Sequence, residues 1–381
     1  MSSGEQFDYG LIRTFTVLGL SVAFVKRSNA NKCKIKIIKV SNTGSTSQYI
    51  INIIVPLNYD SRTFISLLNI LCMKLHPKFI ILPRMDAKLF LFSLAKMRKL
   101  SLKKLLWYSP TPAFIYKVPY LIRNCNNFAH YILLFIKAIC SAIFTPILPL
   151  LYDYVLLRDT LTYRFLYKFY RRRKILLLPP VWNYNVLTIE SNYLSADEII
   201  KKYKPYILIT ISLRRGKCIS SIELYYFKLA TLLAKFLSNL NFVIVGSSIE
   251  DIKQIDNELN FPENLHVLGR IYGVSYQQLL LNATAVLAYV LLPGNSNRVM
   301  ESITYGKPTI VSKIAQIYHP GLKHFYNCFV LDLDSKCFVK LKSVLNNNAI
   351  LEMLGKKASF LNNIYMHLCC KRLEQLFREL C

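Results

Sequence analysis

The sequence predicts an α/β protein with two Rossmann-like, doubly wound domains that face each other across a cleft. The chain has 381 residues, a length that suits two domains. Hydrophobic residues make up 53% of it and charged residues 18%, which excludes a disordered or fibrous chain. Short β-branched runs alternate with segments of helical period along most of the sequence, as in a parallel α/β fold.

Residues 1–183 are expected to form the first domain, because strand-like runs recur through this half. These runs are Lys34–Val40, Ile50–Val55, Phe79–Leu82, Leu105–Ser109, Val155–Leu157 and Ile175–Leu178. Pro179 and Pro180 end the last run, since proline cannot donate to a sheet ladder. Residues 184–195 follow as a linker.

Residues 131–152 interrupt the α/β pattern, because this stretch contains a single charged side chain, Lys137. A helix of this length could cross a bilayer, but Pro146 and Pro149 are expected to interrupt it. A helix lying in the membrane interface, a buried helix and a true span all stay open. We favour the interfacial helix, because the flanking basic residues suit an anionic surface.

Residues 196–357 are expected to form the second domain, with clearer strand signals. Its runs are Tyr206–Ser212, Asn241–Gly246, His266–Arg270, Ala285–Val290, Pro308–Lys313 and Phe329–Leu333. Helical segments separate nearly all of them, which predicts parallel strands with crossover connections. Open sheets of this kind bind ligands beyond the carboxyl ends of their strands.

Positive charge is concentrated in the N-terminal half. Residues 1–190 hold 27 basic and 7 acidic side chains, against 22 and 14 in residues 191–381. A phosphate-bearing lipid, an anionic membrane surface or nucleic acid would each suit this charge. Basic and aromatic side chains interleave in residues 163–174, but we interpret them as a helix face and a solvated run, with lipid headgroups favoured over bases as partner.

Cysteine and histidine spacing shows no zinc motif, so no metal site is expected. The first eight residues lack the basic and apolar regions of a signal peptide, which predicts a cytoplasmic location.

The most informative stretch surrounds a polar loop, Gly294–Asn297, that leads from a strand into a helix carrying Glu301. Backbone N–H groups and the positive end of a helix dipole suit a diphosphate. Glu301, one turn into the helix, could accept hydrogen bonds from ribose hydroxyls. Gly306 is expected to end the helix and Pro308 to open the next strand.

Four motif segments follow one another in a recognisable order: Gly246, Leu268–Gly269, Leu279–Ala285 and Glu301–Pro308. In this order they resemble the donor domain of retaining GT-B glycosyltransferases of group 1, family four. The resemblance is specific over residues 200–340 and covers residues 9–200 in outline. It implies a nucleotide-sugar donor, and a final helix at residues 358–381 that packs back toward the first domain.

The resemblance also implies a donor site. Glu301 would bind the ribose, and Arg270 lies where the family's backbone reads the nucleobase edge. The first Glu of the family's paired-Glu motif falls at Pro293, so either Asn295 or Asn297 substitutes for it or the sugar specificity is atypical. The donor diphosphate would lie on a five-residue cradle made of Gly294, Asn295, Ser296, Asn297 and Arg298.

The family neutralises its leaving diphosphate with cations, for which Arg214, Arg215 and Lys217 are the candidates here. We take Arg214 and Lys217 as catalytic; a solvated basic turn is the alternative.

The acceptor half matches less closely. Gly10 and Arg13 resemble the glycine loop and first helix of the acceptor domain. Arg84 and Asp86 follow a strand at the expected cleft edge, where Asp86 could orient an acceptor hydroxyl or simply cap a helix. The His that the family often has after the 105–109 strand is missing.

The resemblance implies a retaining glycosyltransferase that needs neither metal nor cofactor. It would act peripherally at the inner face of the membrane, on a lipid-linked or glycan acceptor. Two other functions stay open. Pro293 and the missing His would fit a catalytically degenerate GT-B scaffold, whereas charge and aromatic content alone support a nucleic-acid-binding protein.

Overall fold

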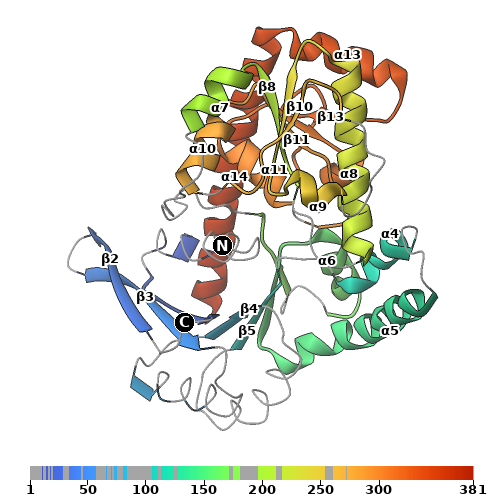
Figure 1. Ribbon diagram of the computed structural model, residues 1–381. Coiled ribbons are helices and arrows are strands. Elements are labelled where there is room, and N and C mark those ends of the chain that lie inside the picture. Colours follow the sequence, from blue (N-terminus) through green and yellow to red (C-terminus); the bar gives the residue numbers. More distant parts are fainter. Residues whose placement is uncertain are drawn as a thin grey trace. The chain divides into compact units, whose positions relative to one another are not determined.

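The computed structural model describes residue 11, residues 14–15, residue 18, and residues 20–28, 34–43, 46–56, 66, 70, 73–74, 80–83, 105–109, 113–122, 128–170, 175–180, 196–211, 217–253, 261–271, 273–294 and 296–380. The chain forms two compact units (Figure 1). Unit 1 consists of Met1–Thr111, Ile143–Val181 and Met366–Cys381, and unit 2 of Pro112–Ala142 and Trp182–Tyr365.

Unit 2 contains a six-stranded sheet in the order β10-β9-β8-β11-β12-β13, with every neighbouring pair parallel. Its strands are β8 Tyr206–Thr210, β9 Asn241–Val245, β10 Leu265–Val267, β11 Ala285–Ala288, β12 Thr309–Val311 and β13 Phe329–Val330. Each lies at one of the strand-like runs predicted for residues 196–357. The predicted α/β class with parallel sheets is confirmed.

Helices cover both faces of this sheet. They are α7 Ala196–Tyr203, α8 Lys217–Phe236, α9 Ile249–Lys253, α10 Gly273–Asn282, α11 Asn297–Thr304, α12 Lys313–Tyr318, α13 Ser335–Leu345 and α14 Asn348–Leu380. Ile209 and Leu287 pack with α8 and α13 in one core, and Figure 1 shows α7 and α10 on the opposite face. There the buried Tyr206 hydroxyl donates to the Leu279 carbonyl oxygen at 2.6 Å. Burial on both faces explains why these strands are continuous apolar runs.

Unit 1 contains a parallel sheet in the order β4-β5-β6-β7. Its strands are β4 Ile80–Pro83, β5 Leu105–Ser109, β6 Tyr154–Leu157 and β7 Ile175–Leu177. Leu156 belongs to a core that includes Leu373 of α14, whereas Val155 and Leu157 pack with Leu166 of α6, Thr160–Tyr167. Alternate side chains of β6 therefore enter two different cores.

A second sheet of unit 1 departs from the expected parallel pattern. β2, Lys34–Thr43, pairs antiparallel with β3, Thr46–Pro56, and β1, Val22–Ser28, pairs parallel with β3. Residues 44 and 45 alone separate β2 from β3, and a parallel crossover needs a dozen or more residues. The connection is therefore too short for the parallel arrangement, and β1 was not predicted at all.

The apolar segment forms a single helix, α5, at Phe128–Leu151, preceded by a 3-10 turn at Phe114–Tyr116 and by α4, Val118–Ile122. The expectation that proline would interrupt this helix was wrong, because α5 continues through Pro146 and Pro149. Each proline removes one backbone donor, and the rest of the ladder continues.

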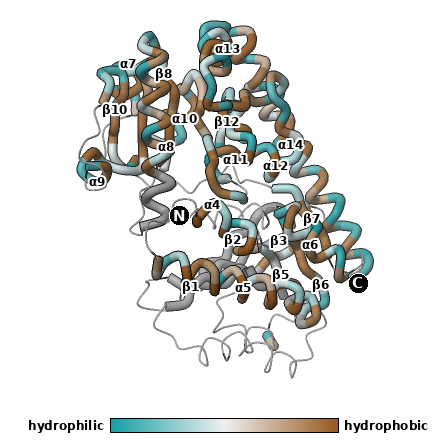
Figure 2. Tube along the Cα trace, turned by 90° about the vertical axis from the view of Figure 1, so that its right-hand side faces the viewer, coloured by the Kyte–Doolittle hydropathy of each residue, from teal (hydrophilic) through white to brown (hydrophobic). Residues whose placement is uncertain are grey.

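Helix α5 is not a core helix. Its stretch Phe128–Ile147 is long and apolar enough to cross a membrane, and 17% of that window is buried. Figure 2 shows hydrophobic residues along much of α5. Its exposed large apolar side chains are Phe128, Tyr131, Ile132, Leu133, Phe135, Ile136, Ile139, Ile143, Phe144, Ile147 and Leu150.

Helix α14 contributes to the cores of both units. Leu354, near its start, belongs to the unit 2 core, and Leu373 and Leu376, near its end, belong to a unit 1 core. The chain therefore passes from unit 2 into unit 1 within one continuous helix.

Candidate functional site

The strand order of unit 2 sets the place of a ligand site. From β8 the chain moves to β9 on one side, and from β11 it moves to β12 on the other, although β8 and β11 are neighbours. Loops at the carboxyl ends of such neighbours diverge and leave room for a ligand. The relevant segments are the residues after Thr210 and those between Ala288 and α11.

Gly246 allows the carboxyl ends of β8 and β9 to approach closely. It has a φ of 105°, and a Cβ atom there would lie 2.4 Å from the Ile211 carbonyl oxygen. The neighbouring Ser247 hydroxyl donates to that same oxygen at 3.0 Å. Only glycine suits this position, which gives one residue of the sequence motif a physical reason.

The loop that leads into α11 has the geometry of an open helix N-terminus. Ser296 is the N-cap residue in an extended conformation, and its side chain makes no capping hydrogen bond. The N–H groups of the first turn are therefore not occupied by that side chain. Gly294 is half-buried and has a φ of 144°. At the far end of α11, Gly306 has a φ of 64°, as a C-terminal glycine should.

A short hydrogen-bond chain joins α11 to α10 and β8. The Tyr276 hydroxyl donates to Glu301 Oε2 at 2.8 Å, and Thr210 Oγ1 lies 3.1 Å from the same hydroxyl. Because the one tyrosine proton goes to the carboxylate, the Thr210 hydroxyl is the donor in the second bond. Among the described residues Tyr276 is the partner of Glu301, so the second carboxylate oxygen stays available to a ligand hydroxyl.

Burial raises the pKa of Glu301 to about 7, while the hydrogen bond from Tyr276 and the charge of Arg298 act in the opposite direction. Burial also raises the pKa of Tyr276 well above its ordinary value. Glu301 therefore changes its charge near neutral pH. A carboxylate in this state is a better acceptor above pH 7 than below it.

Arg298 does not face outward as a lone cation. Its guanidinium carbon lies 4.9 Å from the centre of the Tyr226 ring on α8. The Tyr226 hydroxyl in turn donates to the Leu287 carbonyl oxygen of β11. The ring thus places a positive charge close to Glu301 at the carboxyl edge.

Five predicted donor-site residues lie together: Gly294, Ser296, Asn297, Arg298 and Glu301 occupy one loop and the helix after it. Arg270 is exposed, beyond the carboxyl end of β10. Lys217 begins α8, but its side chain is not described. The other predicted residues lie outside the described part of the chain: Gly10, Arg13, Arg84, Asp86, Arg214 and Asn295.

Two residues of this edge, Thr210 and Tyr276, escaped the sequence analysis. A third, His319, was expected only to lie in a loop near the donor pocket, with no catalytic part. The imidazole Nε2 of His319 accepts a hydrogen bond from the Ser296 N–H at 2.9 Å. None of the three belongs to a motif, and folding alone brings them to Glu301 and to the loop. A helical tyrosine or a buried histidine has no sequence signal that separates it from a core residue.

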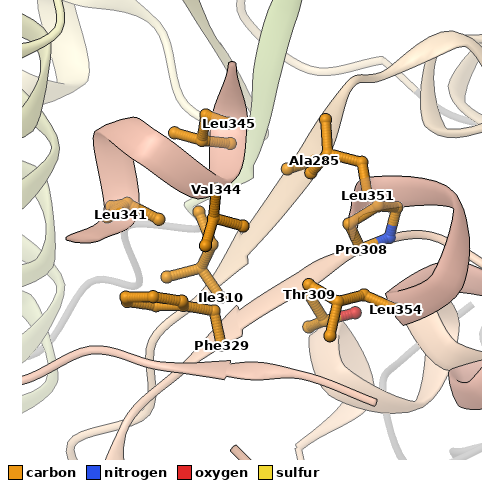
Figure 3. A pocket seen from close by; sticks show the side chains of 10 residues that line it. All are labelled: Ala285, Pro308, Thr309, Ile310, Phe329, Leu341, Val344, Leu345, Leu351 and Leu354. Atoms are coloured by element: carbon orange, nitrogen blue, oxygen red, sulfur yellow. The ribbon is translucent and has the colours of Figure 1, made fainter. Parts of the chain in front are cut away.

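A small cavity in unit 2 is not a second site. Its lining is almost wholly apolar and comes from α13, the start of α14 and the strands beneath them, with Leu341, Phe329 and Leu354 among the side chains in Figure 3. It offers no charged group to orient a ligand. Within the described ranges, no group of three or more His, Cys, Asp or Glu side chains could hold a metal ion.

No family model and no curated protein matches the sequence. Solved structures do match. Sucrose-phosphate synthase from Thermosynechococcus elongatus is 14% identical with a TM-score of 0.62, over 98% of this chain and 92% of that one. A trehalose-6-phosphate synthase from E. coli bound with UDP-2-fluoro glucose is 10% identical with a TM-score of 0.58, over 98% and 95%.

A mutant of S. aureus TarM in complex with Fondaparinux, alpha-GlcNAc-glycerol and UDP is 15% identical with a TM-score of 0.50, over 76% of this chain and 53% of that one. These proteins are two-domain GT-B glycosyltransferases. At identities this low, the similarity shows the fold and does not identify the substrate. The chain has the GT-B fold that the sequence motifs resemble.

Proposed function

We propose that this protein is a glycosyltransferase that moves a hexosyl unit from a nucleoside-diphosphate sugar to an acceptor. One observation carries the proposal. Glu301 accepts a hydrogen bond from Tyr276, and it lies on α11, whose open N-terminus is at the point where the chain leaves β8 and β11 in opposite directions. The site thus offers a hydroxyl acceptor and a set of N–H donors within two turns of one helix. A ribose joined to a diphosphate presents the complementary groups in the same order.

The fold neighbours support this choice of donor. Two of their structures contain UDP or a UDP-sugar analogue. In the proposed reaction the bond between the anomeric carbon and the diphosphate oxygen breaks, and a bond to the acceptor oxygen forms as the acceptor hydroxyl loses its proton. Arg214 and Lys217 are proposed to stabilise the leaving diphosphate, and Asp86 to orient the acceptor beside Arg84, Gly10 and Arg13. The configuration at the anomeric carbon is proposed to be retained.

A ligand screen tests the donor site. Melting temperatures of the purified chain are measured with UDP-, GDP- and ADP-sugars, because a ligand at 100 times its Kd stabilises the folded state by about 2.7 kcal/mol. We expect one nucleotide class to raise the melting temperature, and the Glu301→Gln variant to lose the effect. Glu352→Gln, an exposed α14 carboxylate paired with Lys356, is the matched control and should respond like the parent.

If no sugar nucleotide stabilises the folded protein, the transferase proposal fails. A catalytically degenerate scaffold would then take its place. Steeply salt-dependent binding of DNA, with no effect of any sugar nucleotide, would instead favour the nucleic-acid-binding function.

We further propose that the protein works as a peripheral protein on the inner face of a membrane, with a lipid-linked acceptor. The support is α5, on which Ile132, Phe135, Ile136, Ile139 and Ile143 are all exposed and follow helical spacing. An apolar stripe of this size in contact with water is unfavourable. Contact with the acyl region of a bilayer removes it from water, and the basic N-terminal half supplies attraction to anionic headgroups.

Attachment in the interface is favoured over a span by the way the chain is connected. Helix α5 runs from unit 2 into unit 1, so a span would place the two units on opposite sides of the bilayer. Helix α14 also joins the units, and it carries Lys356, Lys371 and Arg372 along its length. A charged helix of this kind is not expected to cross the hydrocarbon.

Vesicle sedimentation tests the membrane proposal. The chain should bind vesicles that contain an anionic lipid more strongly than zwitterionic ones. The double variant Ile136→Ser, Ile139→Ser should lower the partition coefficient by about tenfold or more, because both side chains contribute buried apolar area. Val339→Ser, at an exposed apolar position on α13, should leave binding unchanged. Equal binding of all variants would contradict the role of α5.

A further inference from the structure

His319 is a fully buried histidine whose ring lies against the loop before α11. It ends α12, its exposed fraction is 0%, and its Nε2 accepts a hydrogen bond from the Ser296 backbone N–H at 2.9 Å. Its Nδ1 has no hydrogen-bond partner among the described residues. The donating group is a backbone N–H, so Nε2 must carry the lone pair and the ring proton must be on Nδ1.

The imidazole is held neutral. Burial lowers the pKa of His319 to about 3, so the ring is neutral and keeps its lone pair on Nε2 at near-neutral pH. Its hold on Ser296 is therefore independent of pH, whereas the charge of Glu301, on the same helix, changes near pH 7.

Helix α12 also holds the other end of the same loop. The Ser312 hydroxyl donates to the Val290 carbonyl oxygen at 2.6 Å, and the Val290 N–H donates back to the Ser312 oxygen at 3.3 Å. One short helix thus fixes the loop at Val290, where it leaves β11, and at Ser296, where it enters α11. Ser312 is the N-cap residue of α12 and His319 is its C-cap residue, so the two anchors of the loop lie at the two ends of one helix.

A purely structural role does not account for His319. A buried ring donor without a partner destabilises the fold, and an apolar side chain of similar volume would avoid that cost. Departures of this kind from good packing are concentrated at functional sites. The histidine does what leucine cannot, because it accepts a hydrogen bond from the N-cap residue of α11.

We propose that His319 is a positioning residue for the nucleotide-sugar donor. It fixes the Ser296 backbone so that the following N–H groups of α11 face the donor diphosphate, and Ser312 fixes the other end of that loop. This inference rests on the proposed function and adds to it the residues that shape the diphosphate site.

Steady-state kinetics of His319→Leu and His319→Gln test the proposal, with the sugar nucleotide that stabilises the parent chain. Loss of one backbone anchor should raise the donor KM of His319→Leu about three- to tenfold, with kcat and the acceptor KM little changed. His319→Gln, whose side-chain oxygen can accept the same N–H, should restore most of the donor affinity. The melting temperature of His319→Leu should change little, because leucine removes the unpaired Nδ1 donor but also the acceptor of the Ser296 N–H.

His324→Leu is the matched control, since His324 Nδ1 accepts the Val330 N–H at 2.9 Å away from the loop, and its donor KM should stay at the parent value. Should His319→Leu not fold, Ser312→Ala releases the other end of the loop and is expected to raise the donor KM in the same direction. A parent-like donor KM in every folded variant of the two positions overturns the proposal. A parent chain that binds no sugar nucleotide overturns the proposed function itself, so the two failures are distinguishable.

Discussion

Each unit places an acid just beyond the carboxyl end of a parallel strand or on the helix that follows, yet the hydrogen bonds of the two acids differ. In unit 1, Asp159 follows β6, and its two oxygens accept the N–H groups of Leu161 and Thr162 at 3.2 and 2.6 Å. In unit 2, Glu301 has one tyrosine donor among the described residues, and its pKa is raised to about 7. A carboxylate whose oxygens are both occupied caps a helix. A carboxylate that keeps one oxygen unoccupied suits a ligand.

Helix α14 allows the cores of the two units to be compared directly, and the largest effect is expected there. It contributes a buried leucine to each core. Leu354→Ala and Leu373→Ala each remove a buried side chain, and each should lower the free energy of unfolding by about 2–5 kcal/mol. In urea unfolding, Leu354→Ala should lower the midpoint of the unit 2 transition, and Leu373→Ala should lower the midpoint of the unit 1 transition. Identical shifts of one shared transition would show that the units unfold together.

Glu301→Gln should stabilise the folded chain above pH 7. A carboxyl whose folded-state pKa is raised destabilises the fold once it is ionised, so stability falls as pH rises from about 4.5 to about 7. Removing the charge should therefore raise the free energy of unfolding by about 3 kcal/mol at pH 8 and by little near pH 4.5. Chemical unfolding at both pH values measures the difference. A destabilised variant at pH 8 would show that Glu301 has a structural role instead.

Asp159→Ala should lower the free energy of unfolding, whereas Glu301→Gln should raise it. It removes the acceptor for two N–H groups at the start of α6, and loss of such a cap costs about 1–2 kcal/mol. The free energy of unfolding at pH 7 measures it, with Asp159→Asn expected to recover part of the loss. No change for Asp159→Ala would remove the distinction between the two acids.

Much of the fold could be predicted from the sequence, because local rules set it. Buried parallel strands must be apolar runs, and the runs at Tyr206, Asn241 and Ala285 could have little other meaning. Gly246 and Gly306 were in the motif for steric reasons that the backbone angles make plain. In unit 1 the same reasoning failed for β1–β3, because the composition of a run does not set its pairing direction. The direction of β2 and β3 follows from the two residues between them, which permit only an antiparallel pair.

The candidate site could be predicted only where it is local in sequence. Glu301 and its loop are one segment, and the order of motifs singled them out. Tyr276 and His319 reach that segment from α10 and from the end of α12, across 25 and 23 residues of chain. Hydrogen bonds between residues this far apart in the chain produce no periodicity or composition that a single sequence would reveal.

Glu301 is proposed to bind the ribose of a nucleotide sugar in its ionised form, and calorimetric titration at pH 6 and pH 8 tests this binding. If only the ionised carboxylate binds, a pKa near 7 makes the donor Kd about tenfold weaker at pH 6 than at pH 8. The groups that face Glu301, Tyr276 and Arg298, keep their protonation over this range. Glu301→Gln should bind weakly at both pH values. Tight binding that is independent of pH in the parent and is kept by Glu301→Gln would contradict the account.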